Sequence, residues 1–339
     1  MERRRLAGVD EMFRVGLNPY GLAYTVGLQG LGTSRWNDRA IGMAGFVALA
    51  RELGARCIEL DGRWLAGATA GERARMRDDL AGETLICSYW LSQTRGETLA
   101  HAVSDTTAVG AAMIRLHLTP VLEGGRASWG ARWQDMVTHG RATLKREAVR
   151  AADAGLVIAI EDHQNFGSEE LVDISQEAGA NVGIVFDTGN AYSVGEDPVA
   201  FAHRAGHRIR HVHLKDYVAQ PTDEGYRLVR CAIGDGCVPL AEIAGVLAAH
   251  APSLTASIEP GALESRHIRL FTAEWWKGYP PRSAPELGTA LRRLRANRLS
   301  EDADSRTPWE RGAPGDEIVA YEMGQIRRSV ENLRRMGFM

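Results

Sequence analysis

Three carboxylates and one histidine in the second half of the chain have the residue types and the spacing of a metal site. Glu161, Asp187 and His213 follow one another at equal intervals of 26 residues (161, 187, 213), and Glu259 comes later. Each stands at or directly after the end of a short apolar stretch. Three carboxylates and one imidazole suit Mn²⁺, Mg²⁺, Co²⁺ or Zn²⁺, and the excess of oxygen ligands favours the first two. We expect one divalent ion, with Mn²⁺ as the leading candidate.

Each of these residues also has an ordinary structural interpretation when it is taken alone. An aspartate after a strand is usually a turn former or a helix cap, and a histidine on a strand is more often a hydrogen-bonded core residue than a ligand. The metal interpretation depends on finding all four at the same end of four apolar stretches. If these stretches are neighbouring parallel strands of a closed barrel, the four side chains converge.

The apolar stretches have the length and composition of buried parallel strands. Eight strands are predicted, at Phe13–Leu17, Cys57–Leu60, Leu85–Tyr89, Met113–Leu118, Leu156–Ile160, Val182–Phe186, Ile209–Leu214 and Leu254–Ile258. Helical periodicity between them predicts helices that include Ile41–Leu53, Thr98–Ala112, Trp133–Ala154 and Pro239–His250. Alternation of strand and helix repeated eight times predicts an α/β fold, a (β/α)8 barrel, with an open doubly wound sheet as the alternative.

The remaining length predicts an extension rather than a second domain. We assign residues 1–281 to the barrel and residues 282–339 to a C-terminal helical extension that packs on the barrel or on a partner subunit. The extension contains a helix around Glu286–Ala296, a polar linker and an amphipathic helix over Glu317–Met336. The longer interval before Glu259 is interpreted as a polar loop at 217–237.

Composition argues against several classes of function. The chain has 339 residues, of which 45% are hydrophobic and 24% charged, as in an average globular protein. A net charge of −3 gives no attraction for nucleic acid or anionic membranes. We find no signal peptide and no stretch near the ~20 apolar residues of a membrane span. Four cysteines without CxxC spacing indicate a reduced protein, so we expect a cytoplasmic location without nucleic acid or membrane partners.

Four motifs carry a family resemblance over about residues 150–262. They are I-E-D-H at Glu161, F-D-T-G-N at Asp187, H-V-H-L-K-D at His213 and S-I-E-P-G at Glu259. They resemble the sugar isomerase/epimerase-like (xylose-isomerase-like) TIM barrels, which include ketose 3-epimerases, inosose dehydratase, hydroxypyruvate isomerase and endonuclease IV. The resemblance implies that the four residues hold one divalent metal, with His213 rather than His211 as the ligand.

The resemblance and the site chemistry imply metal-assisted removal of a proton next to the carbonyl of a keto- or aldo-sugar, through an enediolate. Isomerisation or epimerisation is the first expectation. In the epimerase branch the two metal-bound glutamates move the proton, which makes Glu161 and Glu259 candidate bases. His163 is either an alternative base or a residue that orients a ligand. Lys215 either polarises the carbonyl or pairs with Asp216.

Weaker candidates for contact with the substrate are His117, Asn190, Trp275 and Trp276. Asn190 takes the place of a substrate-contacting histidine of the ketose 3-epimerases, which argues against that particular reaction. The two tryptophans either pack within a loop or form a platform for a sugar or an aromatic aglycone. A platform would indicate the large subunit of a C-glycoside deglycosidase, which eliminates the aglycone of 3-oxo-glycosides and works with a small subunit. We therefore expect a sugar or glycoside substrate and either a homo-oligomer or a hetero-oligomer.

Two hypotheses from other classes of function are disfavoured. Endonuclease-IV-like DNA repair would require more histidine and acidic ligands and a basic surface, which the net charge of −3 argues against. A metal-free, non-catalytic subunit that keeps the barrel as a scaffold is disfavoured because all four ligand positions are intact.

Overall fold

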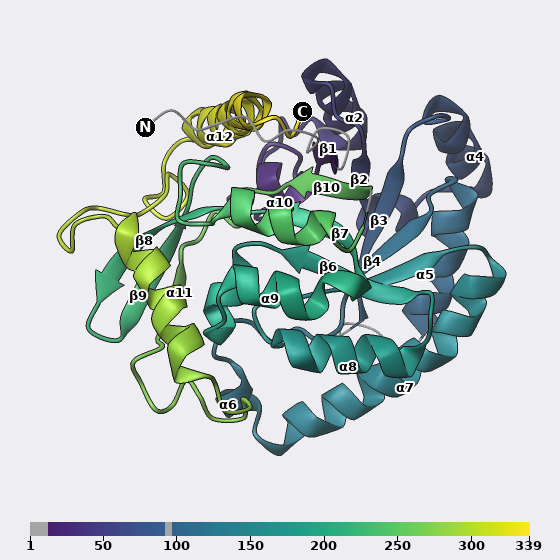
Figure 1. Cartoon of the computed structure of the whole chain (residues 1–339). Coiled ribbons are helices and arrows are strands. Elements are labelled where there is room, and N and C mark those ends of the chain that lie inside the picture. The colour runs from purple at the N-terminus through teal and green to yellow at the C-terminus, as the bar shows by residue number, and fades with distance from the viewer. Residues whose placement is uncertain (1–12, 92–96, 252) are drawn as a thin grey trace.

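The barrel predicted from the sequence is confirmed. The computed structural model describes residues 13–91, 97–251 and 253–339. Eight parallel strands close into a barrel in the order β1-β10-β7-β6-β5-β4-β3-β2, with helices around the outside (Figure 1). The barrel strands are β1 Phe13–Leu17, β2 Ile58–Asp61, β3 Leu85–Trp90, β4 Met113–His117, β5 Val157–Glu161, β6 Val182–Asp187, β7 Ile209–Leu214 and β10 Leu254–Ile258. All eight agree with the prediction to within one residue at each end.

Helices connect the strands and cover the outside of the barrel. They are α2 Gly42–Leu53, α3 Gly62–Ala66, α4 Ala70–Asp79, α5 Glu97–Ala108, α6 Arg126–Trp129, α7 Ala131–Asp153, α8 Ser168–Ala178, α9 Pro198–Ala205, α10 Leu240–Ala248, α11 Ala284–Ala296 and α12 Gly315–Met336, with the short 3₁₀ segments η1 Pro19–Leu22, η3 Asn190–Val194 and η4 Gly206–Arg208. The sequence did not predict α4, because this helix has few apolar residues and buries none. Its start is fixed by a capping box between Thr69 and Glu72.

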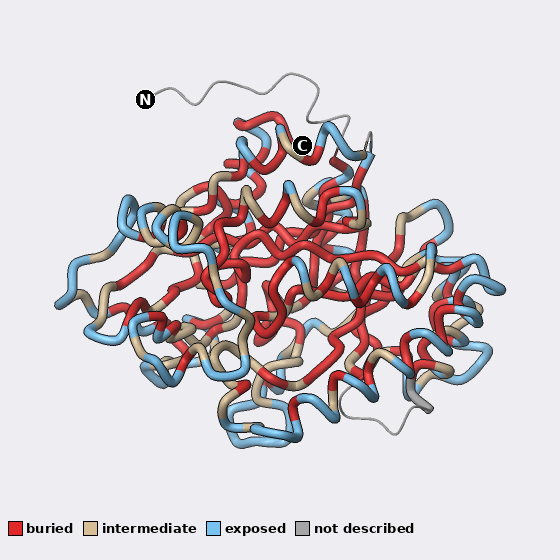
Figure 2. The backbone as a smooth tube through the Cα atoms, turned by 60° about the horizontal axis from the view of Figure 1, so that its bottom comes forward, coloured by how far each residue is buried: buried red, intermediate tan, exposed pale blue. Residues whose placement is uncertain are grey.

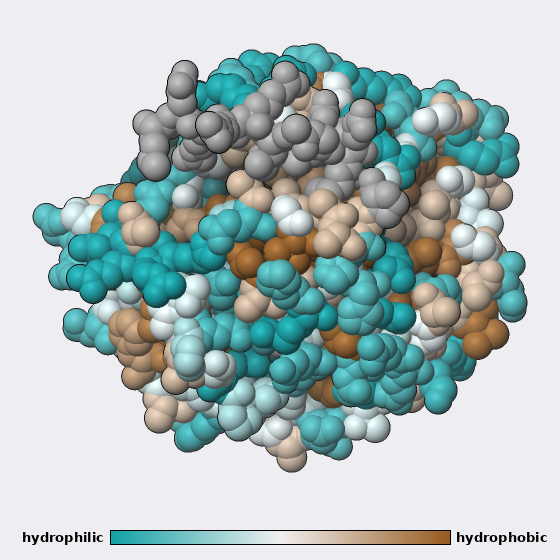
Figure 3. Space-filling model, in the orientation of Figure 1, coloured by the Kyte–Doolittle hydropathy of each residue, from teal (hydrophilic) through white to brown (hydrophobic). Residues whose placement is uncertain are grey.

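Burial follows the barrel strands, and exposed residues lie mainly on the outer sides of the helices (Figure 2). The face shown in Figure 3 is mainly hydrophilic, with apolar side chains in small scattered groups. Several polar or charged side chains of the barrel strands are at most 1% exposed, among them Glu59, Arg115, His211 and His213. Buried ionic groups are costly unless they are paired, so the interior of this barrel is built around polar contacts as well as packing.

The prediction of a loop at 217–237 is wrong. Residues Tyr217–Thr222 and Gly225–Arg230 form an antiparallel hairpin, β8 and β9, and β11 (Arg266–Ile268) adds a third strand. The side chains of Tyr217, Ala219 and Leu228 are buried. Polar residues in both strands obscure the alternation of buried and exposed positions in the sequence. Only the turn residues Asp223-Glu224 indicate a hairpin there.

The C-terminal helix α12 packs on the chain segment that follows β1. Glu322, which is fully buried, accepts hydrogen bonds from Tyr24 N (3.1 Å), Thr25 N (2.8 Å) and Thr25 Oγ1 (2.6 Å). Beyond the helix, Phe338 stacks on Phe13 of β1 with ring centroids 5.5 Å apart. Within the described ranges, no helix has both the length and the apolar character needed to cross a membrane.

Replacing Glu322 by alanine is expected to destabilise the protein by about 3 kcal/mol, because it leaves two buried backbone N–H groups and a buried hydroxyl without their acceptor. Arg230, whose Nη1 is 3.9 Å from the Glu322 carboxylate, would also lose its counter-charge. Urea unfolding followed by circular dichroism measures the change. Glu317→Ala on the same helix, at an exposed pair with Arg311, should change stability by less than about 0.5 kcal/mol. Equal effects of the two substitutions would contradict this account of the extension.

Candidate metal centre

The barrel brings the four predicted ligands to one place. Glu161 ends β5, Asp187 ends β6, His213 lies near the end of β7, and Glu259 directly follows β10. One possible ligand atom from each lies within 4.8 Å of those from the other three. The strands β5, β6, β7 and β10 are consecutive neighbours in the closed sheet, which is why residues far apart in sequence meet here.

The unpaired atoms of this cluster fit a cation. Glu161 Oε1, His213 Nδ1 and Glu259 Oε2 are buried and have no hydrogen-bond partner among the described residues. His213 Nδ1 is within ion-pair distance of both carboxylates, 3.0 Å from Glu259 Oε2 and 3.7 Å from Glu161 Oε1, but neither contact has the geometry of a hydrogen bond. Buried polar atoms are normally satisfied, and an exception calls for a bound group. Two carboxylate oxygens and one imidazole nitrogen are suitable ligands for a divalent ion.

Asp187 is held in place by both of its oxygens. Oδ1 accepts hydrogen bonds from Gly189 N (3.0 Å) and Asn190 N (3.2 Å), and Oδ2 pairs with Lys215 Nζ. Lys215 Nζ also lies 3.0 Å from Glu259 Oε1. Burial raises the pKa of Asp187 to about 6, although the ammonium group of Lys215 acts in the opposite direction. Lys215 thus places a positive charge between two of the four candidate ligands.

Glu59 orients the His213 ring. Glu59 Oε2 lies 3.0 Å from His213 Nε2, on the side opposite the unpaired Nδ1. Burial lowers the pKa of His213, but the carboxylates of Glu59, Glu259 and Glu161 more than offset this and hold it well above its usual range. A carboxylate on one imidazole nitrogen leaves the other nitrogen free for a metal. The sequence analysis did not identify Glu59.

Replacing Glu59 by glutamine is expected to weaken metal binding by about 10–100-fold, because an amide binds the His213 N–H less strongly and fixes the ring less well. Competition against a fluorescent chelator measures the affinity. Glu83→Gln provides a matched control, since Glu83 pairs with Arg51 at a solvent-accessible site. Unchanged affinity in Glu59→Gln would show that this contact does not act on the metal centre.

Arg115 is the second interior residue that sequence reasoning missed. Its Nη2 pairs with Glu161 Oε2, and its Nε lies 3.7 Å from Glu59 Oε1. Burial raises the pKa of Glu161, but the Arg115 guanidinium, helped by the hydrogen bond from His117, more than offsets this and holds it well below its usual range. A signal was present in the sequence: Glu59 and Arg115 each stand between two aliphatic residues in the middle of a predicted strand. On an inward-facing position such a charge needs a partner.

His117 and His163 form an aromatic group beside Glu161. His117 Nε2 lies 2.6 Å from Glu161 Oε2, and the two imidazole rings stack with centroids 3.9 Å apart. Trp90 packs edge-on against His117, with centroids 3.8 Å apart. Burial lowers the pKa of His117 to about 4 and holds that of His163 well below its usual range, so both rings are neutral. His163 Nδ1 has no hydrogen-bond partner among the described residues.

Asn190, a predicted substrate residue, is held next to Asp187 by Gln164. Gln164 Nε2 donates to Asn190 Oδ1 at 3.1 Å. The backbone of Gln164 has φ of 63°, a left-handed conformation that is uncommon for a residue other than glycine and is often found at functional sites. Gln164 Oε1 and Asn190 Nδ2 are buried without a partner in the described chain, which leaves one acceptor and one donor for a ligand hydroxyl.

His211 does not join the four-residue cluster. Its ring lies 5.2 Å from the ring of His213, and its nitrogens contact Thr255 Oγ1 (2.7 Å) and Ser257 Oγ (3.1 Å). These hydroxyl groups satisfy both nitrogens. His211 therefore belongs to the interior of the barrel, below the candidate metal centre.

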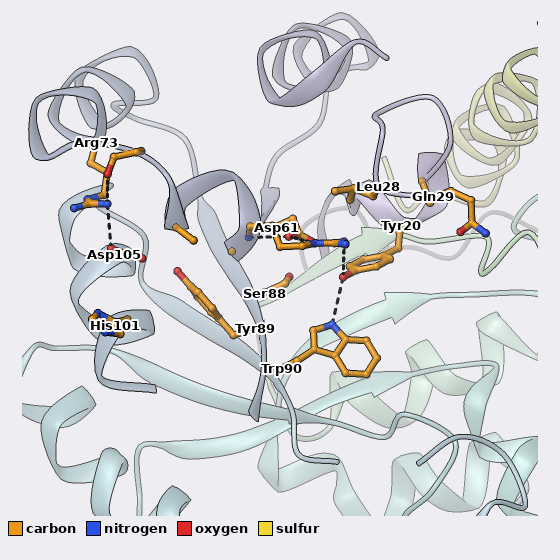
Figure 4. A pocket seen from close by; sticks show the side chains of 15 residues that line it. Tyr20, Leu28, Gln29, Asp61, Arg73, Ser88, Tyr89, Trp90, His101 and Asp105 are labelled. Atoms are coloured by element: carbon orange, nitrogen blue, oxygen red, sulfur yellow. Dashed lines mark hydrogen bonds and ion pairs between the residues drawn. The ribbon is translucent and has the colours of Figure 1, made fainter. Parts of the chain in front are cut away.

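Trp275 and Trp276 pack against the surrounding loops. A side chain at Gly124 would lie 2.2 Å from the Trp275 ring, which shows how closely this ring packs on the loop after β4. Trp276 Nε1 donates to Leu270 O at 3.0 Å. Neither residue lines the pocket of about 690 Å³ at the carboxyl ends of β1, β2 and β3 (Figure 4). Their contact with substrate remains a prediction, and their observed contacts are those of loop packing.

The family described as "Xylose isomerase-like TIM barrel" matches residues 47–277, which is more than half of the chain. This range includes all four candidate ligands. The chain belongs to this family. The relatives that it resembles in sequence include inosose dehydratases, which are enzymes.

The curated relatives match over limited regions. An inosose dehydratase of Lacticaseibacillus casei is 30% identical over 99 residues, covering 28% of this chain and 32% of the relative. An inosose dehydratase of Clostridium beijerinckii is 29% identical over 144 residues, or 38% and 47% of the two chains. The rhizopine catabolism protein MocC of Rhizobium meliloti is 36% identical over 90 residues, or 26% of each. The matches thus span less than half the length of these relatives.

Solved structures support the fold. A D-tagatose 3-epimerase-like protein superposes with a TM-score of 0.52 at 17% identity, covering 75% of this chain and 95% of the other. Protein SMc04130 of Sinorhizobium meliloti gives the same TM-score at 18% identity, covering 86% of this chain and 99% of the other. At such identities the likeness establishes the architecture alone.

Proposed function

We propose that this barrel is a divalent-metal-dependent enzyme that removes a proton next to the carbonyl of a sugar or a cyclitol. The observation that carries the proposal is the convergence of the unpartnered atoms of Glu161, His213 and Glu259. Oxygen-rich ligation favours Mn²⁺ or Mg²⁺. A divalent ion held there would polarise the carbonyl and its neighbouring hydroxyl, which lowers the cost of removing the proton between them.

His163 is the base that the geometry favours. Its Nδ1 is unpartnered, its ring is neutral, and stacking on His117 fixes its orientation beside Glu161. Glu161 and Glu259 are the alternative bases, but each is also a candidate metal ligand and pairs with a cation, Arg115 or Lys215. These contacts leave the two carboxylates less free to take up a proton than the unpartnered Nδ1 of His163.

Two candidate reactions differ in what happens after the proton has been removed. Returning it to the former carbonyl carbon gives isomerisation, and returning it to the same carbon from the opposite face gives epimerisation. Losing a β-substituent instead gives elimination, which is dehydration when water leaves and deglycosylation when an aglycone leaves. The names of the curated relatives, which are dehydratases in most cases, support elimination as the second candidate. Both reactions begin with the same proton abstraction, so the assigned residues keep their roles.

Incubation in D₂O separates these candidates. Free ketoses, an inosose and 3-oxo-glycosides are offered to the Mn²⁺-loaded protein, and NMR follows deuterium at the carbon next to the carbonyl. Deuterium incorporation with a rearranged sugar supports isomerisation, and release of water or aglycone supports elimination. If no compound exchanges its proton or reacts, the proposed proton abstraction is contradicted.

A further inference from the structure

A segment of the long chain between β10 and α11 crosses the mouth of the barrel. β10 and β4 lie four strands apart in the closed sheet of eight, so they stand on opposite sides of the barrel. Residues 271–282, which we call the strap, come after β10 and reach α6, which follows β4 (Figure 1). The strap therefore spans the width of the mouth.

The strap contacts the loops after β4, β5 and β6 along its course. Trp275 packs on the loop after β4, as described above. A Cβ added at Gly195, after β6, would lie 2.5 Å from the Trp276 ring. A Cβ added at Gly167, after β5, would lie 2.8 Å from the guanidinium nitrogens of Arg282. These contacts place the strap over the sector of the mouth that holds the candidate metal centre, whereas no strap residue lines the pocket of Figure 4.

The candidate metal centre is almost closed to solvent in this arrangement. Glu161, Asp187 and His213 are at most 1% exposed, and Glu259 is 5% exposed. A sugar that reacts there has to reach these residues, so part of the chain around the mouth moves during turnover. Within the strap only Trp275 is buried. Segments with few buried side chains open most readily, which makes the strap the element suited to this motion.

Arg126 of α6 joins the strap to the loop after β5. Its side chain is buried, and its Nη1 donates to Gly278 O at 2.9 Å. Its guanidinium carbon lies 4.2 Å from the centroid of the Tyr279 ring, a cation–π contact. On the other side, Arg126 Nε donates to Asn165 O at 2.7 Å, and Nη2 donates to the same oxygen. One side chain thus holds two backbone segments that are far apart in sequence.

Asn165 belongs to the short loop that carries His163. Its Nδ2 donates to Thr119 Oγ1 at 2.6 Å, so the loop after β4 holds this residue as well. Gln164 stands between Asn165 and His163 and has the left-handed φ of 63°. Such a backbone conformation persists only where its surroundings impose it. A displacement of Asn165 therefore changes the orientation of His163.

Arg126 has an anchor that is independent of both segments. Its Nη1 and Nη2 donate to the two carboxylate oxygens of Glu170 at 3.0 Å and 2.7 Å, a strong two-pronged pair. The Trp133 ring lies 4.3 Å from its guanidinium carbon. Arg126 therefore stays in place when the strap moves away. Water then reaches the exposed guanidinium and competes for its hydrogen bonds to Asn165 O.

We propose that Arg126 is a positioning residue that couples docking of the strap to the orientation of His163, so that the base is aligned only when the strap is closed. The role of His163 as the base rests on the proposed function. The coupling of the two segments rests on the contacts of Arg126 alone.

Hydrogen exchange followed by mass spectrometry tests the coupling on the full chain in EDTA. Gly278→Ala disturbs the strap, because Gly278 has φ of 83° and an added Cβ would lie 3.2 Å from Arg126 Cβ. We expect amide exchange to rise about tenfold in the strap and at least about threefold in residues 163–167. Gly312→Ala is the matched control, since Gly312 has φ of 71° but no atom within 4 Å of the added Cβ. It should change neither segment.

Arg126→Met removes the proposed link. Both segments should exchange faster in this variant, and adding Gly278→Ala should then raise exchange in the strap alone. The coupling is overturned if Gly278→Ala leaves residues 163–167 unchanged in the wild-type background. It is equally overturned if the substitution still acts on them when Arg126 is absent. Gly278→Ala alone decides the coupling if Arg126→Met does not fold.

Kinetics distinguish positioning of the base from a general loss of structure. With a substrate identified by the exchange assay in D₂O, Arg126→Met should lower kcat about tenfold to hundredfold and leave KM and Mn²⁺ affinity within about threefold of the wild type. Arg126→Lys keeps a cation at this position and should recover part of kcat. An unchanged kcat in folded Arg126→Met would contradict the positioning role.

The two proposals fail in different ways. Hydrogen exchange needs neither a metal ion nor a substrate, so it reports the coupling even if no compound reacts. Coupled segments in a protein that abstracts no proton would contradict only the proposed function. An active enzyme whose strap and base loop exchange independently would contradict only the role of Arg126.

Discussion

Replacing His163 by glutamine is expected to lower kcat by about 10²–10⁴-fold, the usual contribution of a positioned general base. The variant should retain its metal, because the unpartnered atoms of the cluster belong to Glu161, His213 and Glu259. Glutamine keeps approximate size and polarity but cannot accept and hold a proton at neutral pH. The exchange assay in D₂O, run beside a metal determination on the same sample, measures both properties.

The pattern across variants distinguishes the base from the ligands. Glu161→Gln should lose metal and activity together, whereas His163→Gln should lose activity alone. A surface histidine gives the matched control: His250→Gln, at an exposed position after α10, should leave both properties unchanged. If His163→Gln retains more than about a tenth of the activity, the base must be sought among the glutamates.

Replacing Arg115 by methionine is expected to destabilise the protein by about 3–5 kcal/mol, the usual cost of removing one member of a buried ionic group. Arg115 and its partners Glu161 and Glu59 are at most 1% exposed. Methionine fills part of the space but leaves the carboxylates of Glu161 and Glu59 without this guanidinium. Urea unfolding in EDTA measures the change without the stabilisation that a bound ion would add.

Arg51→Met is the comparison for this substitution. Arg51 pairs with Glu83 at 3.0 Å, and its side chain is 48% exposed. Exposed pairs contribute about 0–1 kcal/mol, so this variant should unfold close to the wild type. A loss below about 1 kcal/mol in Arg115→Met would show that the interior carboxylates do not depend on the arginine.

The barrel was predictable because its signals are local. Each strand is a short aliphatic run that ends in a turn or a polar residue, and parallel burial on both faces makes such runs continuous. The position of the four ligands followed from the same pattern, since Glu161 and Asp187 close their strands. The repeated interval of 26 residues then predicted that these side chains lie at the same end of the barrel. Local patterns and closure of the sheet were sufficient for this part.

The surroundings of the site depend on contacts that no local pattern records. The contact of Glu59 with His213 joins residues of β2 and β7, and the sequence shows only a charge within an apolar run. Tyr20 likewise accepts hydrogen bonds from two residues that are distant in sequence, Trp90 at the end of β3 and Arg63 of α3. Trp275 looked like a binding platform from its type, but the close packing at Gly124 became visible only in three dimensions.

The metal content of the purified protein tests the central claim most directly. Elemental analysis is made on the wild type, on Glu161→Gln and on Asp187→Asn, each with and without reloading with Mn²⁺ and each checked for folding by circular dichroism. The account predicts about one divalent ion per folded wild-type chain and its loss from both variants. Wild-type protein that holds no ion after reloading, or folded variants that bind as well as the wild type, would contradict the metal centre and the proton abstraction built on it.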